Sequence, residues 1–149
     1  MAAFRLIASW VLAILLIAFF LHVTLHPWCE PTPGYVKFYD APGDHVVFSA
    51  IADGSRLSLF EPAGRFVAGV LELIAALLIL LPISRRAGAC LAALLLGAGV
   101  AIHLSPWLGR EVPLPEGGSD GGMHFLVYVV FLVFSLLLML VHPPERSRY

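Results

Sequence analysis

The sequence predicts an all-α membrane protein: an antiparallel bundle of four transmembrane helices, with a short amphipathic surface helix in the first outer loop. Composition is the first observation behind this class, because 60% of the 149 residues are hydrophobic and only 13% are charged, far from the usual balance of a soluble domain. The mean hydropathy of +0.91 agrees with it. The second observation is a set of four apolar runs, each close to the roughly 20 residues that cross a bilayer. They cover residues 4–26, 64–81, 87–104 and 123–142, with outer loops at 27–63 and 105–122, and we expect them to form a single domain.

The first run ends at Pro27, which cannot extend a helix. His22 and His26 occupy its last turns four residues apart, so both rings lie on one face of the helix. Such a pair can chelate a metal ion. Its imidazoles can also simply hydrogen-bond at the membrane interface, and of the two interpretations we favour the second.

The long segment after the first run begins with CEPTPG, whose prolines exclude regular structure. Two structures compete for YVKFYDAPGDHVVFSAIAD, which follows it. One is a hairpin turning at APGD, and the other is a short helix that is capped by Asp44 and ends near Ala52. Val47, Phe48 and Ile51 recur at helical spacing, so we expect the helix, lying on the outer membrane surface.

The second run lies in PAGRFVAGVLELIAALLILLP, between Pro62 and Pro82, and carries a carboxyl group, Glu72, near its middle. An unpaired charge at that depth costs roughly 2.5 kcal/mol or more. Small residues share the helix face of Glu72, which allows close helix contact there. We therefore expect Glu72 to point into the bundle, with Arg65 about two turns away on the same face.

The third run is rich in Gly and Ala, which suits close packing, and places His103 on one face with Gly99 and Ala92. The polar loop SPWLGREVPLPEGGSDGG separates it from the fourth run. There a stripe recurs every three or four residues and should face the bundle interior. It could relay protons or merely hydrogen-bond neighbouring helices, and the sequence favours neither. The stripe comprises His124, Tyr128, Phe131, Ser135, Leu138 and His142.

Arginine placement predicts the orientation. Arg85 and Arg86 lie in the short connection between the second and third runs, and Arg5, Arg146 and Arg148 lie near the chain ends. Because short cytoplasmic loops are enriched in Lys and Arg, we expect both termini in the cytoplasm. The net charge of −1 gives no indication of a nucleic-acid partner.

A series of residues then matches a known pattern in order and spacing. It comprises Lys37, Ala41-Pro42, Phe48, EPAGR with Pro62, Gly64 and Arg65, GVLELIAALLILLP with Gly69, Glu72 and Pro82, AIHL with His103, LG with Gly109, and DGG with Asp120, Gly121 and Gly122 before Phe125. On these residues, from Lys37 to about Phe134, the chain resembles the DoxX and DoxX-like family of small four-span bacterial membrane proteins. In members of that family the segment after Ala-Pro looks like a short amphipathic helix, so the resemblance implies the helix and not the hairpin.

The resemblance implies a location in the bacterial inner membrane and an accessory or redox-associated role. Some family members are subunits of quinone-linked oxidoreductases such as thiosulfate:quinone oxidoreductase, and others are accessory partners in oxidative-stress complexes. An oxidoreductase partner subunit or further copies of this chain are therefore expected as partners, besides the lipid bilayer. No phosphate loop, dinucleotide fingerprint, nucleophile elbow or Cys-x-x-Cys is present, so we do not expect an enzyme on its own.

Three functional hypotheses follow. In the first, a polar pocket in the outer leaflet binds a quinone or another lipophile. Hydrogen-bond donors near the interface, with an acid deeper in the bundle, can bond to the ring of such a molecule and transfer its protons. The pocket residues would be Lys37, Arg65, Glu72, His103 and Asp120. In the second, the protein is a non-catalytic assembly or scaffold protein whose polar residues serve helix packing. In the third, a metal ion or haem is bound by His22, His26, His103 and His124.

Overall fold

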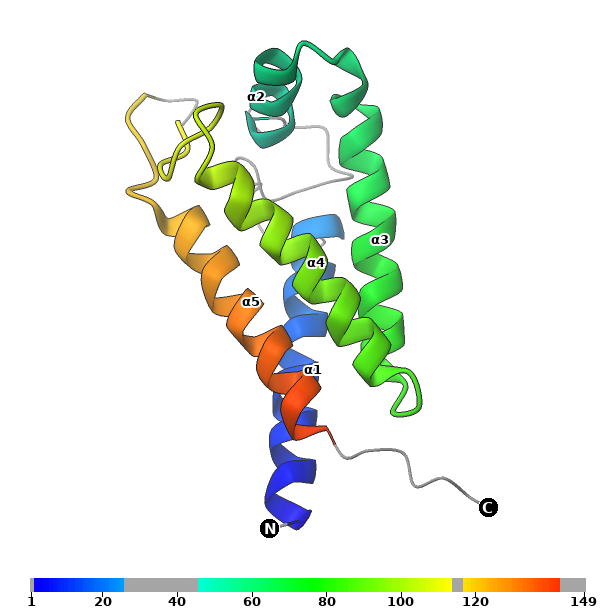
Figure 1. The fold of residues 1–149 in the computed structure, drawn as a ribbon. Helices are drawn as coiled ribbons and strands as arrows, with labels where there is room; N and C mark the ends of the chain where they lie inside the picture. The colour runs from blue at the N-terminus through cyan, green and yellow to red at the C-terminus, as the bar shows by residue number, and fades with distance from the viewer. Residues whose placement is uncertain (1, 26–45, 114–116, 143–149) are drawn as a thin grey trace.

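A computed structural model describes residues 2–25, 46–113 and 117–142 of the chain (Figure 1). Four of its helices are long and apolar enough to cross a membrane, which confirms the four predicted spans. Their bounds differ from the predicted bounds by at most two residues, chiefly because Arg85 and Arg86 already belong to a helix. These helices are α1 (Ala2–Leu25), α3 (Ala63–Leu80), α4 (Arg85–His103) and α5 (Met123–Val141).

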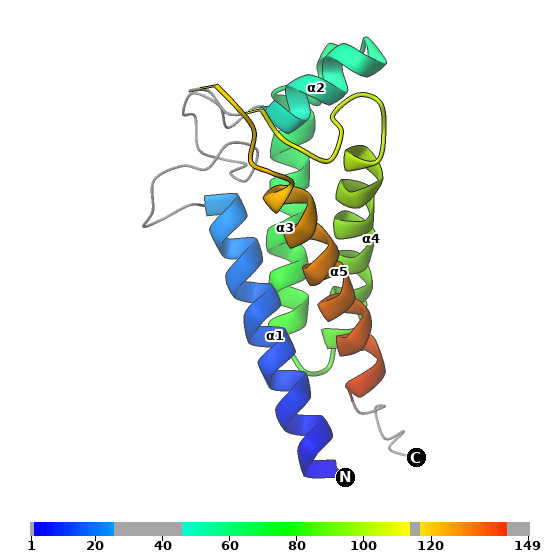
Figure 2. The ribbon, with the colours of Figure 1, turned by 90° about the vertical axis from the view of Figure 1, so that its left-hand side faces the viewer.

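The four long helices form a closed ring in cross-section. Contacts join α1 to α3, α3 to α4, α4 to α5, and α5 back to α1. Figures 1 and 2 place the start of α1 and the end of α5 at one end of the bundle, so each helix runs antiparallel to both neighbours. We call this the termini end, and the opposite end the α2 end. The predicted antiparallel four-helix bundle is therefore confirmed.

The short helix α2 (Val46–Ser55) lies across the α2 end of the bundle (Figure 2). It confirms the predicted surface helix and excludes the hairpin for these residues, although Asp44, its predicted cap, lies outside the described residues. The apolar positions Val47 and Ile51 are buried, as their helical spacing predicts. A 3-10 turn, η1 (Ser58–Phe60), connects α2 to α3.

Apolar side chains cover both the inside and the outside of the bundle. Leu16 and Phe20 of α1 are buried together with Ile79, Leu96 and Leu138 from the other three helices. On the outer surface large apolar side chains remain exposed along each long helix, among them Ile14, Val67, Leu94 and Leu140. A helix that is hydrophobic all round belongs in a lipid environment, so the surface is suited to a bilayer.

The termini end is held together by a fully buried arginine. The Arg85 Nε donates to the Ile79 carbonyl at 2.9 Å, and Nη1 donates to Ser9 Oγ at 3.2 Å. Its guanidinium also lies 3.9 Å from the centre of the Trp10 ring, an arrangement that stabilises a cation. Arg85 therefore ties α4 to the last turn of α3 and to α1.

His142 closes the same end from α5. Its Nε2 donates to the Pro82 carbonyl at 3.0 Å, since a carbonyl can only accept, and Nδ1 lies 3.0 Å from Ser9 Oγ. Arg86 donates to the His142 carbonyl at 2.9 Å. The polar groups at this end are thus engaged in joining the four long helices.

Candidate functional site

A cavity of about 410 Å³ lies between α3 and α4 at the α2 end. This volume falls within the range of small-molecule sites. Val67, Ala68 and Leu71 line it from α3, and Leu95, Ala98 and Ile102 line it from α4. Phe20 of α1 and Tyr128 of α5 form its inner wall, while α2 covers it with Val47, Phe48 and Ile51. Its walls are almost entirely apolar, so it is suited to a lipophilic molecule.

The cavity reaches the outer surface of the bundle. Val67, one of its lining residues, is 59% exposed on α3. The α3 and α4 ribbons diverge toward the α2 end, and α2 spans them there (Figure 1). A molecule dissolved in the bilayer could thus enter sideways between these two helices.

Glu72 is the acidic residue in the cavity wall. It is buried, and its Oε2 accepts a hydrogen bond from Thr24 Oγ1 of α1 at 2.8 Å. This confirms the expectation that Glu72 points into the bundle. Thr24, which is itself fully buried, was not recognised from the sequence, because a hydroxyl group in the last turn of an apolar helix gives no periodic signal.

A histidine pair lies behind the Tyr128 wall of the cavity. His103 of α4 and His124 of α5 are both buried, and His103 Nε2 lies 3.1 Å from His124 Nδ1. The His103 Nδ1 must carry a hydrogen, because it lies 2.9 Å from the Gly109 carbonyl, which can only accept. When both rings are neutral, His124 therefore donates to His103.

Tyr128 connects the histidine pair to the cavity. Its ring centre lies 5.0 Å from that of His124 and 5.8 Å from that of His103, and the same residue lines the cavity. Gly99 of α4 leaves room for the Tyr128 ring, since a Cβ at Gly99 would overlap the ring carbons. Tyr128 therefore contacts both the cavity and the two histidines.

Asp120 organises the loop before α5. Oδ1 accepts from the backbone N–H groups of Val112 and Gly122 at 2.8 and 2.9 Å, and Oδ2 accepts from that of His124 at 2.8 Å. Partial burial alone would raise the pKa of the carboxyl group, but the donors from His124, Val112 and Gly122 and the nearby His124 outweigh it, so the Asp120 pKa lies below its ordinary value. Asp120 therefore stabilises the start of α5.

The predicted pocket residues occupy separate places in the structure. Glu72 lines the cavity, whereas His103 and Asp120 belong to the α4–α5 loop and its histidine pair. Arg65 is almost fully buried, and its Nε donates to Glu61 Oε1 at 3.0 Å within one turn of chain. Lys37 lies outside the described residues. The sequence indicated which residues were polar and inward-facing, but it could not show which of them share one space.

The predicted histidine set is brought together only in part. His103 and His124 meet, His22 lies half-buried on α1, and His26 lies outside the described residues. Within residues 2–25, 46–113 and 117–142 no group of three or more His, Cys, Asp or Glu side chains could hold a metal ion. A metal on His103 Nε2 would displace its hydrogen bond with His124 Nδ1, and the metal or haem hypothesis stays a prediction.

The stripe predicted on the fourth span does face the bundle interior. His124, Tyr128, Ser135, Leu138 and His142 are all buried. Phe131, the sixth residue of the stripe, is half-buried and stacks on Phe19 of α1 at a ring-centre distance of 4.1 Å. Ser135 Oγ donates to the Leu132 carbonyl of its own helix at 2.7 Å. His124 and His142 bond to groups at opposite ends of the bundle, so in these contacts the stripe serves helix packing.

Comparison of the chain with protein-family models, curated proteins and solved structures found no match.

Proposed function

We propose that this protein is a DoxX-like accessory subunit of the bacterial inner membrane that binds a quinone-like or other lipophilic small molecule in the α3–α4 cavity. The observation that carries the proposal is an apolar cavity of about 410 Å³ with the Glu72 carboxyl group in its wall. Apolar walls with few polar groups are typical of ligand sites. The oxidoreductase partner that the resemblance implies would supply the electron chemistry.

The chain's own residues would bind and orient the molecule. The apolar walls exclude water, and Glu72 offers a hydrogen-bonding group to a hydroxyl or carbonyl on the ligand. Thr24 fixes the position of the Glu72 carboxyl group through its hydrogen bond. Entry from the bilayer between α3 and α4 suits a molecule that is dissolved in lipid.

Charge supports placing the termini end in the cytoplasm. Arg5, Arg85 and Arg86 lie at that end. Among the described residues the loop acids Glu111 and Asp120 lie at the α2 end, which would face the periplasm under the positive-inside rule. The cavity would then open in the periplasmic leaflet.

Quinone quenching of tryptophan fluorescence tests the proposal, because Trp107 lines the cavity. Decylubiquinone should quench the purified protein saturably. Ala68→Leu, which fills the cavity, should weaken binding by about tenfold or more. Ala87→Leu, an exposed position at the termini end, is the matched control and should change it less than about twofold; this factor corresponds to about 0.4 kcal/mol.

The result also separates the proposal from its alternative. Quenching that does not saturate, or that Ala68→Leu leaves unchanged in a folded protein, would contradict the lipophile site. A role in assembly would then be the better account. In that case Glu72→Gln should preserve function, whereas bulky substitutions at Gly64 or Gly69 should remove it.

A further inference from the structure

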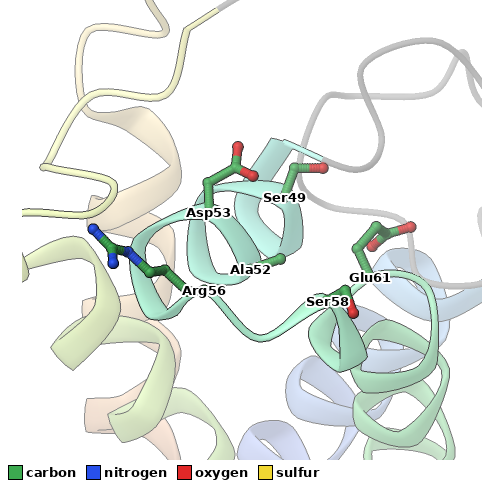
Figure 3. Close-up of a pocket in the computed structure, with 6 residues that line it drawn as sticks. All are labelled: Ser49, Ala52, Asp53, Arg56, Ser58 and Glu61. Atoms are coloured by element: carbon green, nitrogen blue, oxygen red, sulfur yellow. The ribbon is translucent and has the colours of Figure 1, made fainter.

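A second hollow lies on the other face of α2. It has a volume of about 450 Å³ and is lined by Ser49, Ala52, Asp53, Arg56, Ser58 and Glu61 (Figure 3). We call it the polar pocket. Its lining mixes hydroxyl and charged groups with apolar surface such as Ala52, whereas the cavity beneath the same helix is almost entirely apolar.

Neighbouring residues of one short segment line the polar pocket and the cavity. Ser58 and Glu61 line the polar pocket, while Phe60 and Gly64, next to them in sequence, line the cavity. The helix α2 likewise presents Ser49 and Asp53 to one hollow and Val47 and Ile51 to the other. The two hollows share no lining residue, but their lining residues are neighbours in the segment that leads into α3, which begins at Ala63.

The charges of the polar pocket are of both signs. Asp53 and Arg56 are exposed, and within the described residues neither side chain forms an ion pair or a hydrogen bond. Figure 3 shows the two side chains extending from α2 in different directions, with the Arg56 guanidinium on the side away from Ser58 and Glu61. Glu61 also lines the pocket, but it is already paired with Arg65. The groups left to meet a ligand are one carboxylate, one guanidinium and the serine hydroxyls.

Arg56 also holds an unusual backbone conformation. Its φ of 60° is the only positive φ of a non-glycine residue in the described chain. The Leu57 N–H donates to the Ala52 carbonyl at 3.1 Å, the closing bond of a helix end at which glycine is the ordinary residue. An arginine in this conformation costs stability relative to glycine, and a backbone outlier of this kind motivates a hypothesis of function for its side chain.

We propose that the polar pocket binds the dipolar headgroup of an amphiphile, a phosphate joined to an ammonium group, whose apolar part occupies the α3–α4 cavity. Arg56 pairs with the phosphate, as a guanidinium suits, and Asp53 pairs with the ammonium. This proposal rests on the proposed function, since the apolar part uses the same cavity. It adds a class of ligand, the zwitterionic phospholipid or lysophospholipid, and a residue that selects it.

Two probes with different heads test the proposal on the full-length protein in non-ionic detergent. Lysophosphatidylcholine carries the dipolar head, and decylubiquinone carries none. Arg56→Gly should weaken lysophosphatidylcholine binding by about tenfold, equivalent to about 1.4 kcal/mol, and leave decylubiquinone binding within about twofold. Arg56→Gln should do the same without changing the backbone preference so strongly. Arg110→Gln is the matched control, because Arg110 lines neither hollow.

The stability of the same variants gives a second readout. Arg56→Gly should raise the unfolding midpoint of the ligand-free protein while it weakens headgroup binding, because glycine favours the positive φ. Ala68→Leu should weaken the binding of both probes. This combination would support the proposal, since a merely structural Arg56 would move stability but not the ratio of the two affinities.

The failures are distinguishable. If lysophosphatidylcholine binds and both Arg56 variants leave its affinity within about twofold, the headgroup site is wrong. If decylubiquinone binds and lysophosphatidylcholine does not, the headgroup site is again wrong, but the lipophile cavity stands. If neither probe binds the folded protein, both the inference and the proposed function are overturned.

Discussion

Substituting Gly99 by alanine should destabilise the protein relative to the same substitution two residues earlier. A Cβ at Gly99 would overlap the Tyr128 ring, whereas beyond the chain neighbours and nearby helix backbone of Gly97 no described atom lies within 4 Å of its Cβ position. Both variants gain the helix propensity of alanine over glycine, about 1 kcal/mol. Only Gly99→Ala adds overpacking, which costs about 1–3 kcal/mol. Because the propensity gain cancels, the two variants should differ by about 1–3 kcal/mol in the free energy of unfolding.

Unfolding in mixed micelles of a mild detergent and dodecyl sulfate, followed by circular dichroism, measures this difference. Gly97→Ala should be equal to or more stable than the parent protein. Gly99→Ala should also weaken decylubiquinone binding, because the displaced ring belongs to the cavity wall. If Gly99→Ala unfolds at the same point as Gly97→Ala or later, the close contact of α4 with Tyr128 is refuted.

Three further changes test other contacts. Arg85→Lys should cost about 2 kcal/mol of unfolding free energy in the same titration, since lysine cannot replace the buried fork of donors. Arg110→Lys, at an exposed position, should cost less than about 0.5 kcal/mol, and equal losses would contradict a special role for Arg85. Thr24→Val should destabilise the protein by about 1–3 kcal/mol, because it removes the 2.8 Å donor to buried Glu72, and an unchanged unfolding point would show that this bond contributes nothing. Asp120 has a lowered pKa, so its contribution to the free energy of unfolding is present above the unfolded pKa of about 3.9 and is lost as pH falls through the lower folded pKa. Below about pH 4 the stability of the parent protein should therefore fall, and that of Asp120→Asn should fall less. Parallel curves for the two proteins would contradict this.

The fold could be predicted because its signals are long and local. Apolar runs of span length, interrupted by Pro27 and Pro82, define the helices without any knowledge of their partners. The inward stripe of the fourth span and the burial of Glu72 also follow from helical periodicity. Arg85 shows the limit of such signals, since it resembles a loop charge in sequence and is fully buried in the structure.

The candidate site could be predicted only in part, because a cavity arises from the divergence of two helices and not from a motif. Ala68, Ala98 and Ile102 line it, yet in sequence they resemble any other apolar residues of a span. The polar residues Glu72, His103 and Asp120 were recognisable as inward-facing, but their distribution between the cavity and the α4–α5 loop depends on how α4 and α5 pack.

The helices α3 and α4 form a wedge with a fixed vertex. At the vertex Arg85 and the close approach of Gly88 to the Ile79 backbone, where a Cβ would lie only 2.6 Å from the nitrogen, hold the helices together. On the open side lies the cavity, which residues from Gly64 to Glu72 line on α3. Gly64 lies 15 residues from Ile79, which is about 22 Å along the helix, so a rotation of about 5° at the vertex displaces that end by about 2 Å. Small angular changes are thus amplified where the ligand would bind. If a molecule binds there from a bilayer as proposed, lateral pressure in that leaflet would work against opening the wedge. By linkage, a lipid composition that relieves the pressure would strengthen binding.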